Sequence, residues 1–333
     1  MEVTESCAVT KWLITGGCGF IGTSLVRNLI HEGGHAVRIL DNLTVGSRED
    51  LAEVCHRAEG KSVSDEVELV VGDIRDEEQC IEVTKDIDVV IHLAANTGVG
   101  PSVKDPRSDM NANVNGTFNM LEASRVNNVK RFIFASSGAP AGEVSPPIHE
   151  ELAPHPVSPY GASKLAGEGY CSAYYNTFGL ETIALRFGNV YGPLSGHKTS
   201  VVAKFIRRAL NKEPLEIYGD GSQTRDFIFI DDLIQAVRKA QSRPGIGGET
   251  FQIATNKETT VSEMVEILIP ILEKNGVFGI NAIHGDRLVG DVMRNFSDTS
   301  KAKRILGWSA VYDLKMGLEK TVDYFIKSGS INE

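Results

Sequence analysis

Tyr160 and Lys164 are the residues of this sequence best suited to proton chemistry. Both lie in the segment Ser158-Pro-Tyr-Gly-Ala-Ser-Lys164, where Ser158 can cap a helix and Pro159 suits its first position. At four residues apart on a helix, the lysine cation stands beside the phenol and lowers its pKa. Such a tyrosine can take a proton from a sugar hydroxyl as a hydride leaves the carbon. The same spacing also arises by chance on exposed helices. How strongly it supports a catalytic role therefore depends on which other motifs precede it along the chain.

A glycine-rich segment, Gly16-Gly-Cys-Gly19-Phe-Ile-Gly22, has the form of a dinucleotide fingerprint. It separates a predicted strand from a predicted helix, whose N-terminus offers free N–H groups to a pyrophosphate. Without a ligand, the same glycines would form only a tight turn. The next strand ends in Asp41, 19 residues after Gly22, in the place of a carboxylate that binds the adenosine ribose. Because a carboxylate there repels a 2′-phosphate, NAD is favoured over NADP.

A second acidic position follows the third predicted strand. Asp73 lies at the end of that strand, where its carboxylate could face the adenine. As a plain turn former at a strand end, Asp73 would be unremarkable.

The bulk composition describes an ordinary globular protein. The chain has 333 residues, 41% of them hydrophobic and 23% charged, and a net charge of −10. That charge argues against nucleic acid or an anionic membrane as the main partner. The five cysteines are scattered without a C-x-x-C pair, which favours reduced thiols, no metal site and a cytoplasmic location. The first ten residues lack the features of a signal peptide, and no apolar run is long enough to span a membrane.

The elements that must position these residues alternate between strands and helices. Apolar runs predict six strands, at 12–15, 35–40, 67–71, 88–93, 129–134 and 180–187. Amphipathic runs predict helices near 20–31, 76–84, 108–126 and 159–178, and the charged segment 53–66 suggests a surface loop. Nearly continuous apolar strands between helices predict an α/β fold with a doubly wound parallel sheet of the Rossmann type.

The pattern loosens after residue 187, where glycines and prolines separate shorter elements. We therefore expect a Rossmann domain over 1–187, to which 225–255 returns, and a smaller mixed α/β lobe for substrate over 188–333.

A series of segments, in order, resembles the extended short-chain dehydrogenase/reductases, and within them the nucleotide-sugar epimerases of the UDP-glucose 4-epimerase type. The segments are TGGCGFIG (15–22), DNLTVGS (41–47), GDIRD (72–76), HLAA (92–95), NVNGT (113–117), ASS (135–137), SPYGASK (158–164), RFGNVYGP (186–193) and TRDFIFIDDL (224–233). The match runs from about residue 11 to 326.

The resemblance implies a tightly held NAD that oxidises C4 of a UDP-sugar to a transient 4-keto intermediate. By position, the base is Tyr160, Lys164 lowers its pKa and holds the nicotinamide ribose, and Ser137 binds the reacting hydroxyl. The residues implied to bind the cofactor are Gly16, Gly19, Phe20, Ile21, Asp41, Asn42, Thr44, Gly46, Asp73, Ile74, Leu93, Ala94, Ala95, Asn113, Ser136, Tyr160, Lys164 and Phe187.

The resemblance also implies a set of substrate contacts. They are Thr97, Ser137, Asn189, Ser200, Val201, Ile217, Tyr218, Arg225, Arg287 and Asp291. Arg287 stands four residues before Asp291, where the family has three, which weakens its assignment to the diphosphate. Asn295 occupies the position whose bulk controls access of an N-acetyl group, and its small size permits a 2-acetamido sugar. His197 and Lys198 either meet an anionic group or form a solvated loop.

Several reactions remain open within this family. The 4,6-dehydratases carry Asp-Glu directly after the serine or threonine, and the UDP-glucuronate decarboxylases carry Glu at the second position. Here the two residues are Gly138 and Ala139, which favours epimerisation over a dehydratase, decarboxylase or reductase. The substrate could be UDP-glucose/galactose, UDP-GlcNAc/GalNAc or UDP-glucuronate/galacturonate.

Two further expectations come from the same likeness. A redox sensor or scaffold that binds NAD without catalysis is disfavoured, because the tyrosine and the lysine are both present. The helices near 108–126 and 159–178 could pair with their copies as a four-helix bundle, which predicts a homodimer.

Overall fold

The central sheet of the computed structural model confirms the predicted fold class. The structure describes residues 9–56, 67–196, 200–286 and 292–328. Seven strands form a parallel sheet in the order β11-β6-β5-β4-β1-β2-β3. Their bounds are β1 Thr10–Thr15, β2 His35–Asp41, β3 Val67–Val71, β4 Val89–His92, β5 Arg131–Ser137, β6 Glu181–Phe187 and β11 Thr250–Ile253.

The chain divides into two compact units, and most of the sheet belongs to the first. This first unit comprises 1–136, 158–184 and 240–250, and the second comprises 137–157, 185–239 and 251–333. The helical elements of the first unit are α1 Phe20–Glu32, α2 Arg48–His56, α3 Glu77–Val83, α4 Val99–Lys104, α5 Pro106–Met110, the π-helical turn η2 Asn111–Asn115, α6 Gly116–Val126 and α7 Pro159–Phe178.

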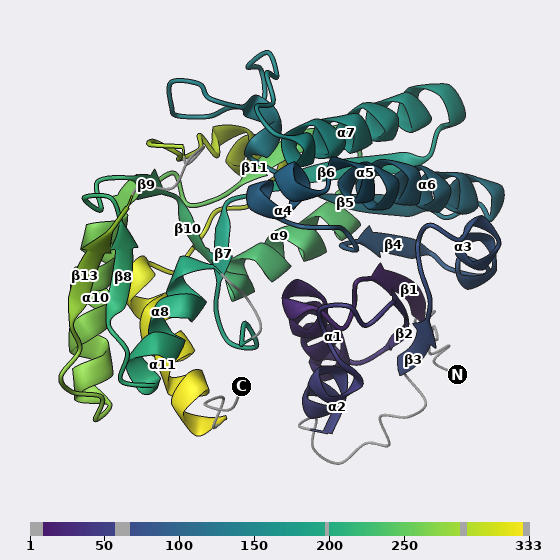
Figure 1. Ribbon diagram of the computed structural model, residues 1–333. Helices are drawn as coiled ribbons and strands as arrows, with labels where there is room; N and C mark the ends of the chain where they lie inside the picture. The colour runs from purple at the N-terminus through teal and green to yellow at the C-terminus, as the bar shows by residue number, and fades with distance from the viewer. Residues whose placement is uncertain (1–8, 57–66, 197–199, 287–291, 329–333) are drawn as a thin grey trace. The chain divides into compact units, whose positions relative to one another are not determined.

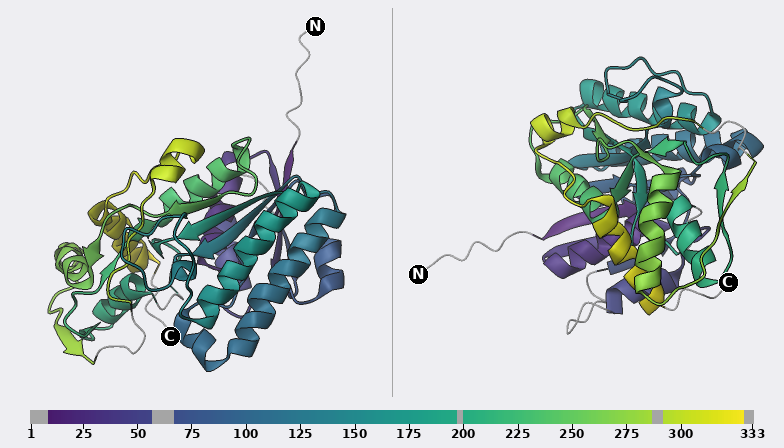
Figure 2. Two further views of the ribbon diagram at one scale, coloured as in Figure 1. Left: turned by 90° about the horizontal axis from the view of Figure 1, so that it is seen from above. Right: turned by 90° about the vertical axis from the view of Figure 1, so that its left-hand side faces the viewer.

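Helices cover both faces of the sheet in the first unit. The pair α1 and α2 packs on one face, and α3, α6 and α7 pack on the other (Figures 1 and 2). Strand residues are buried on both faces, as in Trp12, Leu13 and Ile14 of β1, which are fully buried. This two-sided burial explains the continuous apolar runs in the sequence.

Helix α7 begins and ends where its sequence predicts. Ser158 accepts a hydrogen bond from Gly161 N at 3.1 Å, and Pro159 occupies the first turn. Gly179 ends the helix with a φ of 73°, and its N–H donates to Tyr175 O. Within the helix, a Cβ at Gly167 would lie 2.4 Å from Phe134 Cζ, so this glycine lets α7 approach β5 closely.

Two predicted segments are wrong in detail. Residues 53–56 were expected in a surface loop, but they form the end of α2, where Leu51 and Val54 are buried. The rest of that segment lies outside the described residues. The helix predicted near 108–126 is three pieces, because the chain widens into the π-helical turn η2 at 111–115 between α5 and α6.

The second unit combines short strands with longer helices. Its elements are η3 Ala139–Ala141, β7 Asn189–Tyr191, α8 Val201–Leu210, β8 Leu215–Tyr218, β9 Thr224–Arg225, β10 Phe227–Phe229, most of α9 Ile230–Ser242, β12 Thr259–Thr260, α10 Val261–Lys274, β13 Ala282–Gly285, η4 Ala302–Leu306 and α11 Leu314–Lys327. Three two-stranded pairs occur among the described residues: β7 with β10, β8 with β13, and β9 with β12.

Asp226 is a polar hub of this unit. It is 1% exposed and accepts hydrogen bonds from Thr255 N and Oγ1, Asn256 N and Ser297 N at 2.5–3.2 Å. Asp226 lies between β9 and β10, and its carboxylate connects this position to the loops that contain 255–256 and 297.

We predict that Asp226→Asn destabilises the second unit by at least about 2 kcal/mol, because an amide N–H would face backbone donors in a buried site. The free energy of unfolding can be measured by urea denaturation. Asp298→Asn is the matched control, because Asp298 is only half-buried and accepts a hydrogen bond from Ser300 N. Equal stability of the two variants would contradict the prediction.

Candidate active site

The glycine-rich loop lies between β1 and α1, in the first unit. Gly16 has a φ of 70°, and a Cβ there would lie 2.9 Å from Ala94 N. A Cβ at Gly22 would lie 2.4 Å from Gly16 O, so the loop closes tightly on the helix. Helix α1 begins after Gly19 with no capping side chain and no acidic residue in its first turn. Its N–H groups and positive dipole are therefore suited to a pyrophosphate.

Asp41 is held in place by the backbone around it. The residue ends β2 and is 8% exposed. Its Oδ2 accepts from Cys18 N at 2.9 Å and its Oδ1 accepts from Leu43 N at 2.8 Å. Each oxygen keeps a second lone pair, so the carboxylate can also accept from a ribose diol.

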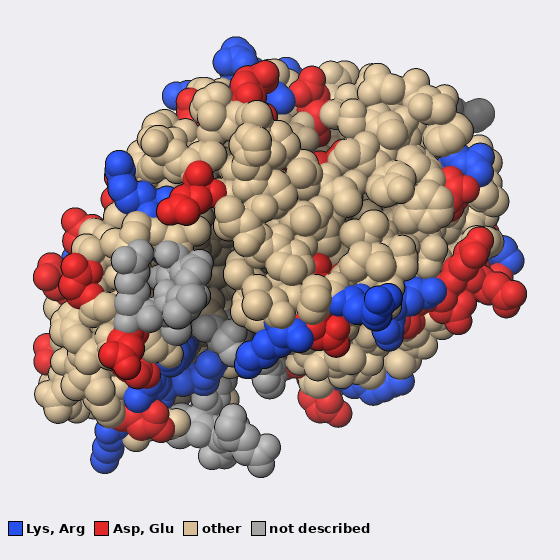
Figure 3. Space-filling view, turned by 45° about the horizontal axis from the view of Figure 1, so that its top comes forward, with Lys and Arg blue, Asp and Glu red and all other residues tan. Residues whose placement is uncertain are grey.

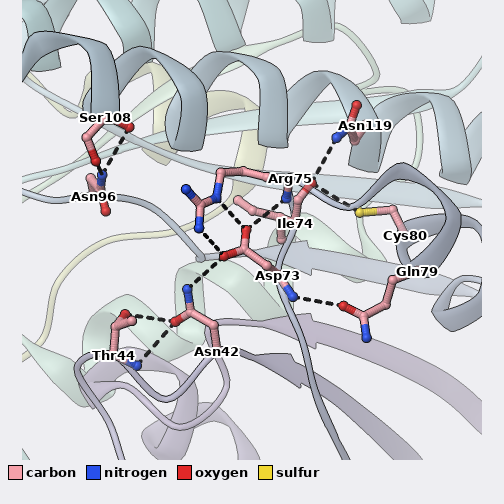
Figure 4. A network of polar contacts seen from close by, with 10 residues as sticks. All are labelled: Asn42, Thr44, Asp73, Ile74, Arg75, Gln79, Cys80, Asn96, Ser108 and Asn119. Atoms are coloured by element: carbon pink, nitrogen blue, oxygen red, sulfur yellow. Dashed lines mark hydrogen bonds and ion pairs between the residues drawn. The ribbon is translucent and has the colours of Figure 1, made fainter.

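Four of the predicted cofactor residues, Asn42, Thr44, Asp73 and Ile74, lie in one polar network at the carboxyl ends of β2 and β3 (Figure 4). Thr44 donates to Asn42 Oδ1 from its backbone and its hydroxyl, and Asn42 Nδ2 donates to Asp73 Oδ2 at 3.2 Å. Asn119 Nδ2 donates to Ile74 O at 3.0 Å.

Arg75, which the sequence reasoning did not single out, completes this network. Its guanidinium binds the Asp73 carboxylate through Nε at 2.9 Å and Nη2 at 2.7 Å (Figure 4). These hydrogen bonds lower the pKa of Asp73 to about 2, so the group is a carboxylate at neutral pH. The signal available in the sequence was the spacing of the two residues in GDIRD.

Three of the predicted cofactor residues, Leu93, Ala94 and Ala95, directly follow β4. Leu93 N donates to Thr15 O at 3.1 Å, and Ala94 N donates to Thr15 Oγ1 at 3.2 Å. Together with the approach of Ala94 to Gly16, this brings 93–95 against the glycine-rich loop. Thr97, predicted to contact substrate, is exposed on the segment that follows.

Lys164 is a buried cation at the side of Tyr160. The residue is 4% exposed, and its Nζ donates to Ala135 O at 2.8 Å. Nζ lies 4.9 Å from the ring centroid of Phe134 and 5.9 Å from that of Tyr160. Burial lowers the pKa of Lys164 to about 8, and Asp109 and Glu168 oppose this change. The geometry places a positive charge beside the phenol, as the spacing in the sequence predicts.

Polar residues around this pair are buried as well. Ser136 Oγ donates to Glu168 Oε1 at 2.5 Å, a partner that the sequence reasoning missed. His92 bridges Thr15 and Thr117 through its two ring nitrogens at 2.8 and 3.1 Å. Burial, and secondarily the charge of Lys164, lowers the pKa of His92 to about 3, so the imidazole is neutral.

Asn113 lies in the turn η2 and is 1% exposed. Its Oδ1 accepts from Asn96 N at 2.7 Å, and its Nδ2 lies within hydrogen-bond distance of Asn96 O, Asp109 Oδ1 and Ser163 Oγ. Asn113 therefore connects α5 and α7 through buried contacts.

Most of the predicted substrate residues lie in the second unit. Ser137 Oγ accepts from Ala139 N at 3.2 Å. Asn189 N donates to Asp226 O at 2.8 Å, and Arg225 Nη1 donates to Thr224 O and Val292 O. Phe187, Ser200 and Val201 are half-buried, as is Asn295, which donates its N–H to Thr224 Oγ1. The remaining predictions, Arg287, Asp291, His197 and Lys198, lie outside the described residues.

Two further residues of the predicted substrate set, Ile217 and Tyr218, belong to β8. Ile217 is buried, and Tyr218 is half-buried. Lys204 of α8 donates to Tyr218 Oη at 2.9 Å, and its Nζ lies 4.6 Å from the ring centroid. Lys204, which the sequence reasoning missed, thereby fixes the orientation of the aromatic ring.

The fold and the glycine-rich loop are those of a dinucleotide-binding protein. A model of the family described as "NAD dependent epimerase/dehydratase family" matches residues 12–254, and the chain belongs to this family. A UDP-glucose 4-epimerase from Mycolicibacterium smegmatis is 36% identical over 95% of this chain and 98% of the relative. A dTDP-glucose 4,6-dehydratase from Neisseria meningitidis is 32% identical over 95% of this chain and 93% of the relative.

Solved structures show the same similarity. The UDP-glucose 4-epimerase of Thermotoga maritima with UDP-glucose has a TM-score of 0.86 and 35% identity, covering 96% of this chain and 99% of that one. The UDP-glucuronic acid 4-epimerase of Bacillus cereus, in complex with UDP-glucuronic acid and NAD, has a TM-score of 0.85 and 31% identity, with coverage of 96% and 100%. The cofactor of this chain is NAD. The uncapped start of α1, the close approach at Gly16 and the fixed Asp41 carboxylate fit it.

One general finding concerns membranes. Across the described residues, none of the helices combines the length and the apolar character needed to cross a bilayer.

We predict that the protein, freed of cofactor, binds NADP at least about 100-fold more weakly than NAD, because Asp41 repels a 2′-phosphate. Isothermal titration calorimetry measures both affinities. Asp41→Asn removes the charge and should lower the ratio of the NADP and NAD dissociation constants by roughly tenfold. Equal affinity of the unchanged protein for the two dinucleotides would show that Asp41 does not discriminate.

Proposed function

We propose that this protein catalyses NAD-dependent epimerisation at C4 of a UDP-sugar through a transient 4-keto intermediate. The observation that carries the proposal is the buried Lys164 cation beside Tyr160, in a chain whose family includes epimerases with this chemistry. The charge of a solvated lysine would stabilise the phenolate only weakly, because water screens it, whereas the charge of a buried lysine stabilises the phenolate strongly.

Each side chain then has a defined task. Bound NAD, held by the glycine-rich loop and Asp41, would supply the hydride acceptor for oxidation at C4 and the hydride donor for reduction from the opposite face. Tyr160 takes the proton of the 4-hydroxyl, and the Lys164 charge stabilises the phenolate that precedes this step. Ser137 holds the reacting hydroxyl by a hydrogen bond. Rotation of the keto sugar before the hydride returns inverts the configuration.

The loop after Ser137 supports epimerisation over elimination. A 4,6-dehydratase must remove a proton from C5 and donate one to the leaving hydroxyl at C6, which requires an acid and a base. Gly138 and Ala139 supply neither. A Cβ at Gly138 would meet no atom within 4 Å, so there is space for a side chain at this position.

For the substrate, we assign the nucleotide to residues of the second unit. Ile217 and Tyr218 are proposed to cradle the uracil, with the diphosphate held by Asn189 and Arg225. Arg287 and Asp291 are proposed to complete the diphosphate and ribose contacts. The small side chain of Asn295 permits a 2-acetamido group, so UDP-GlcNAc/GalNAc stands beside UDP-glucose/galactose and UDP-glucuronate/galacturonate.

The experiment that tests this function offers the purified protein UDP-glucose, UDP-GlcNAc, UDP-glucuronate and dTDP-glucose, with products resolved by NMR. We expect inversion at C4 of at least one UDP-sugar. Formation of a 4-keto-6-deoxy product from dTDP-glucose would assign a dehydratase. Bound NAD without turnover of any UDP-sugar would refute the epimerase proposal and favour a non-catalytic NAD-binding role.

We predict that Tyr160→Phe lowers kcat by roughly 10²–10⁴-fold while leaving NAD bound, since only the proton acceptor is removed. Tyr170→Phe, on the same helix and exposed, is the matched control and should keep the wild-type rate. NAD content is read from the absorbance of the purified variants. A Tyr160→Phe enzyme with near-normal turnover would show that another group is the base.

We also propose a homodimer formed through α6 and α7. Phe118 of α6 and Tyr170 and Phe178 of α7 are 39%, 39% and 53% exposed, and the rings of Phe118 and Tyr170 lie 5.5 Å apart. The face over α5, α6 and α7 is mostly free of charged residues (Figure 3). Large exposed aromatic groups on a face with few charged residues favour burial against another protein surface, and two such helix pairs would form a four-helix bundle.

We predict that the wild-type protein has twice the 36.1 kDa mass of one chain in light scattering, and that Phe118→Asp converts it to a monomer. Phe278→Asp, at a side chain that is 73% exposed in the second unit, should leave the dimer intact. A monomeric wild-type protein would contradict the proposed bundle.

A cytoplasmic location is proposed from the cysteines. Cys18, Cys55, Cys80 and Cys171 are free thiols, as expected in a reducing compartment. Fractionation of cells that express the full chain would test this location.

A further inference from the structure

Asp109 is a buried carboxylate that the proposed mechanism does not use. It belongs to α5 and is 3% exposed. Its Oδ1 accepts from Asn113 Nδ2 at 3.0 Å. Within the described part of the chain, its Oδ2 is buried without a hydrogen-bond partner. An acidic group in this environment loses its hydration and must be compensated by nearby charge or dipoles.

A short chain of hydrogen bonds connects Asp109 to the helix turn that carries the tyrosine. Asn113 Nδ2 lies 3.1 Å from Ser163 Oγ, and Ser163 Oγ donates to Tyr160 O at 3.0 Å. Asn113 and Ser163 are both nearly fully buried. The amide of Asn113 has two hydrogens but three acceptors within reach, and the charged carboxylate is the strongest of them. Asp109 therefore adds a charged acceptor to the Asn96 backbone contacts that hold the Asn113 amide in one orientation.

The second link is electrostatic. Lys164 loses its hydration on burial, which lowers its pKa, and Asp109 is the largest of the influences that raise it again, ahead of Glu168 and Cys171. The other titratable neighbours of Lys164 are Tyr160, whose ring it faces, and His92, whose low pKa leaves it uncharged. Asp109 and Glu168 are thus the two carboxyl groups that raise the pKa of Lys164 within the described part of the chain.

We propose that Asp109 is a positioning residue for the Tyr160–Lys164 pair, which orients Asn113 and Ser163 beneath the tyrosine and supplies negative charge that keeps Lys164 protonated. The inference rests on the proposed function, because it assigns Lys164 its cationic role. Asp109 itself need not touch sugar or cofactor.

The test replaces the charge and keeps the shape. In Asp109→Asn, loss of the negative neighbour makes Lys164 give up its proton more readily, so the alkaline limb of kcat/KM should move down by about half a pH unit or more. Asp105→Asn is the matched control. Asp105 is the exposed N-cap residue of the same short helix, its side chain accepts a hydrogen bond from Ser108 N, and asparagine is an equally good N-cap residue. Its pH profile should match the wild type.

A readout without turnover separates this inference from the proposed function. NMR of lysine labelled with ¹³C at Cε follows the ionisation of Lys164 in the NAD-bound protein, with the signal assigned by Lys164→Arg. The pKa should fall by about half a unit or more in Asp109→Asn and stay unchanged in Asp105→Asn. Should Asp109→Asn fail to fold, Asp109→Ser removes the same charge and keeps a hydroxyl that can accept from Asn113. An unchanged Lys164 pKa, or a rate loss equal at every pH, would reduce Asp109 to a structural role and overturn the proposal.

Discussion

The buried ammonium of Lys164 is the interaction on which the first unit's site depends. An isolated cation in a protein interior is expensive, and it persists only where specific partners replace its hydration. Here those partners are the carbonyl oxygen of Ala135 at 2.8 Å, the ring of Phe134 at 4.9 Å and the carboxyl groups of Asp109 and Glu168. Strand β5 and helix α7 must therefore lie close together, which Gly167 permits by offering no side chain against Phe134.

The uncharged state of His92 matters for this site as much as the charge of Lys164. His92 lies close enough to Lys164 for their charges to interact, and a protonated imidazole there would repel the ammonium. Its burial between Thr15 and Thr117 prevents this, because both ring nitrogens are hydrogen-bonded to hydroxyl groups and the low pKa keeps the ring uncharged. The lysine thus remains the one strong positive charge that the phenol of Tyr160 senses from this group of residues.

The cofactor end of the same unit follows a different principle, in which N–H donors of the backbone and of side chains fix the carboxylates before a ligand arrives. Asp41 is bound by two N–H groups, one of them from the glycine-rich loop. Asp73 is bound by Arg75 and Asn42. Because these carboxylates are already oriented, NAD binding loses less conformational entropy than it would with mobile side chains. The arrangement joins the ends of β2 and β3 to the loop before α1.

The sequence by itself determined the features that depend on neighbours along the chain. Helix periodicity placed Tyr160 and Lys164 on one face, Ser158 and Pro159 marked the start of α7, and the glycines between β1 and α1 identified the dinucleotide loop. Where the outcome depended on distant packing, the local pattern was insufficient. Residues 53–56 are helical because burial of Leu51 and Val54 stabilises α2. The π-helical turn η2 interrupts a helix that the sequence pattern predicted to be continuous.

Only the tertiary structure decided which polar groups are buried and what each of them meets. Glu168 and Asp109 carry no signature in the sequence, since a carboxylate on a helix is most often solvated. Their roles follow from contacts with residues that folding brings together, such as Ser136 with Glu168 across 32 positions of the chain. The charge state of Lys164 is decided in the same way: spacing puts it beside the tyrosine, but burial and its carboxyl neighbours set its pKa, and those exist only in the folded chain.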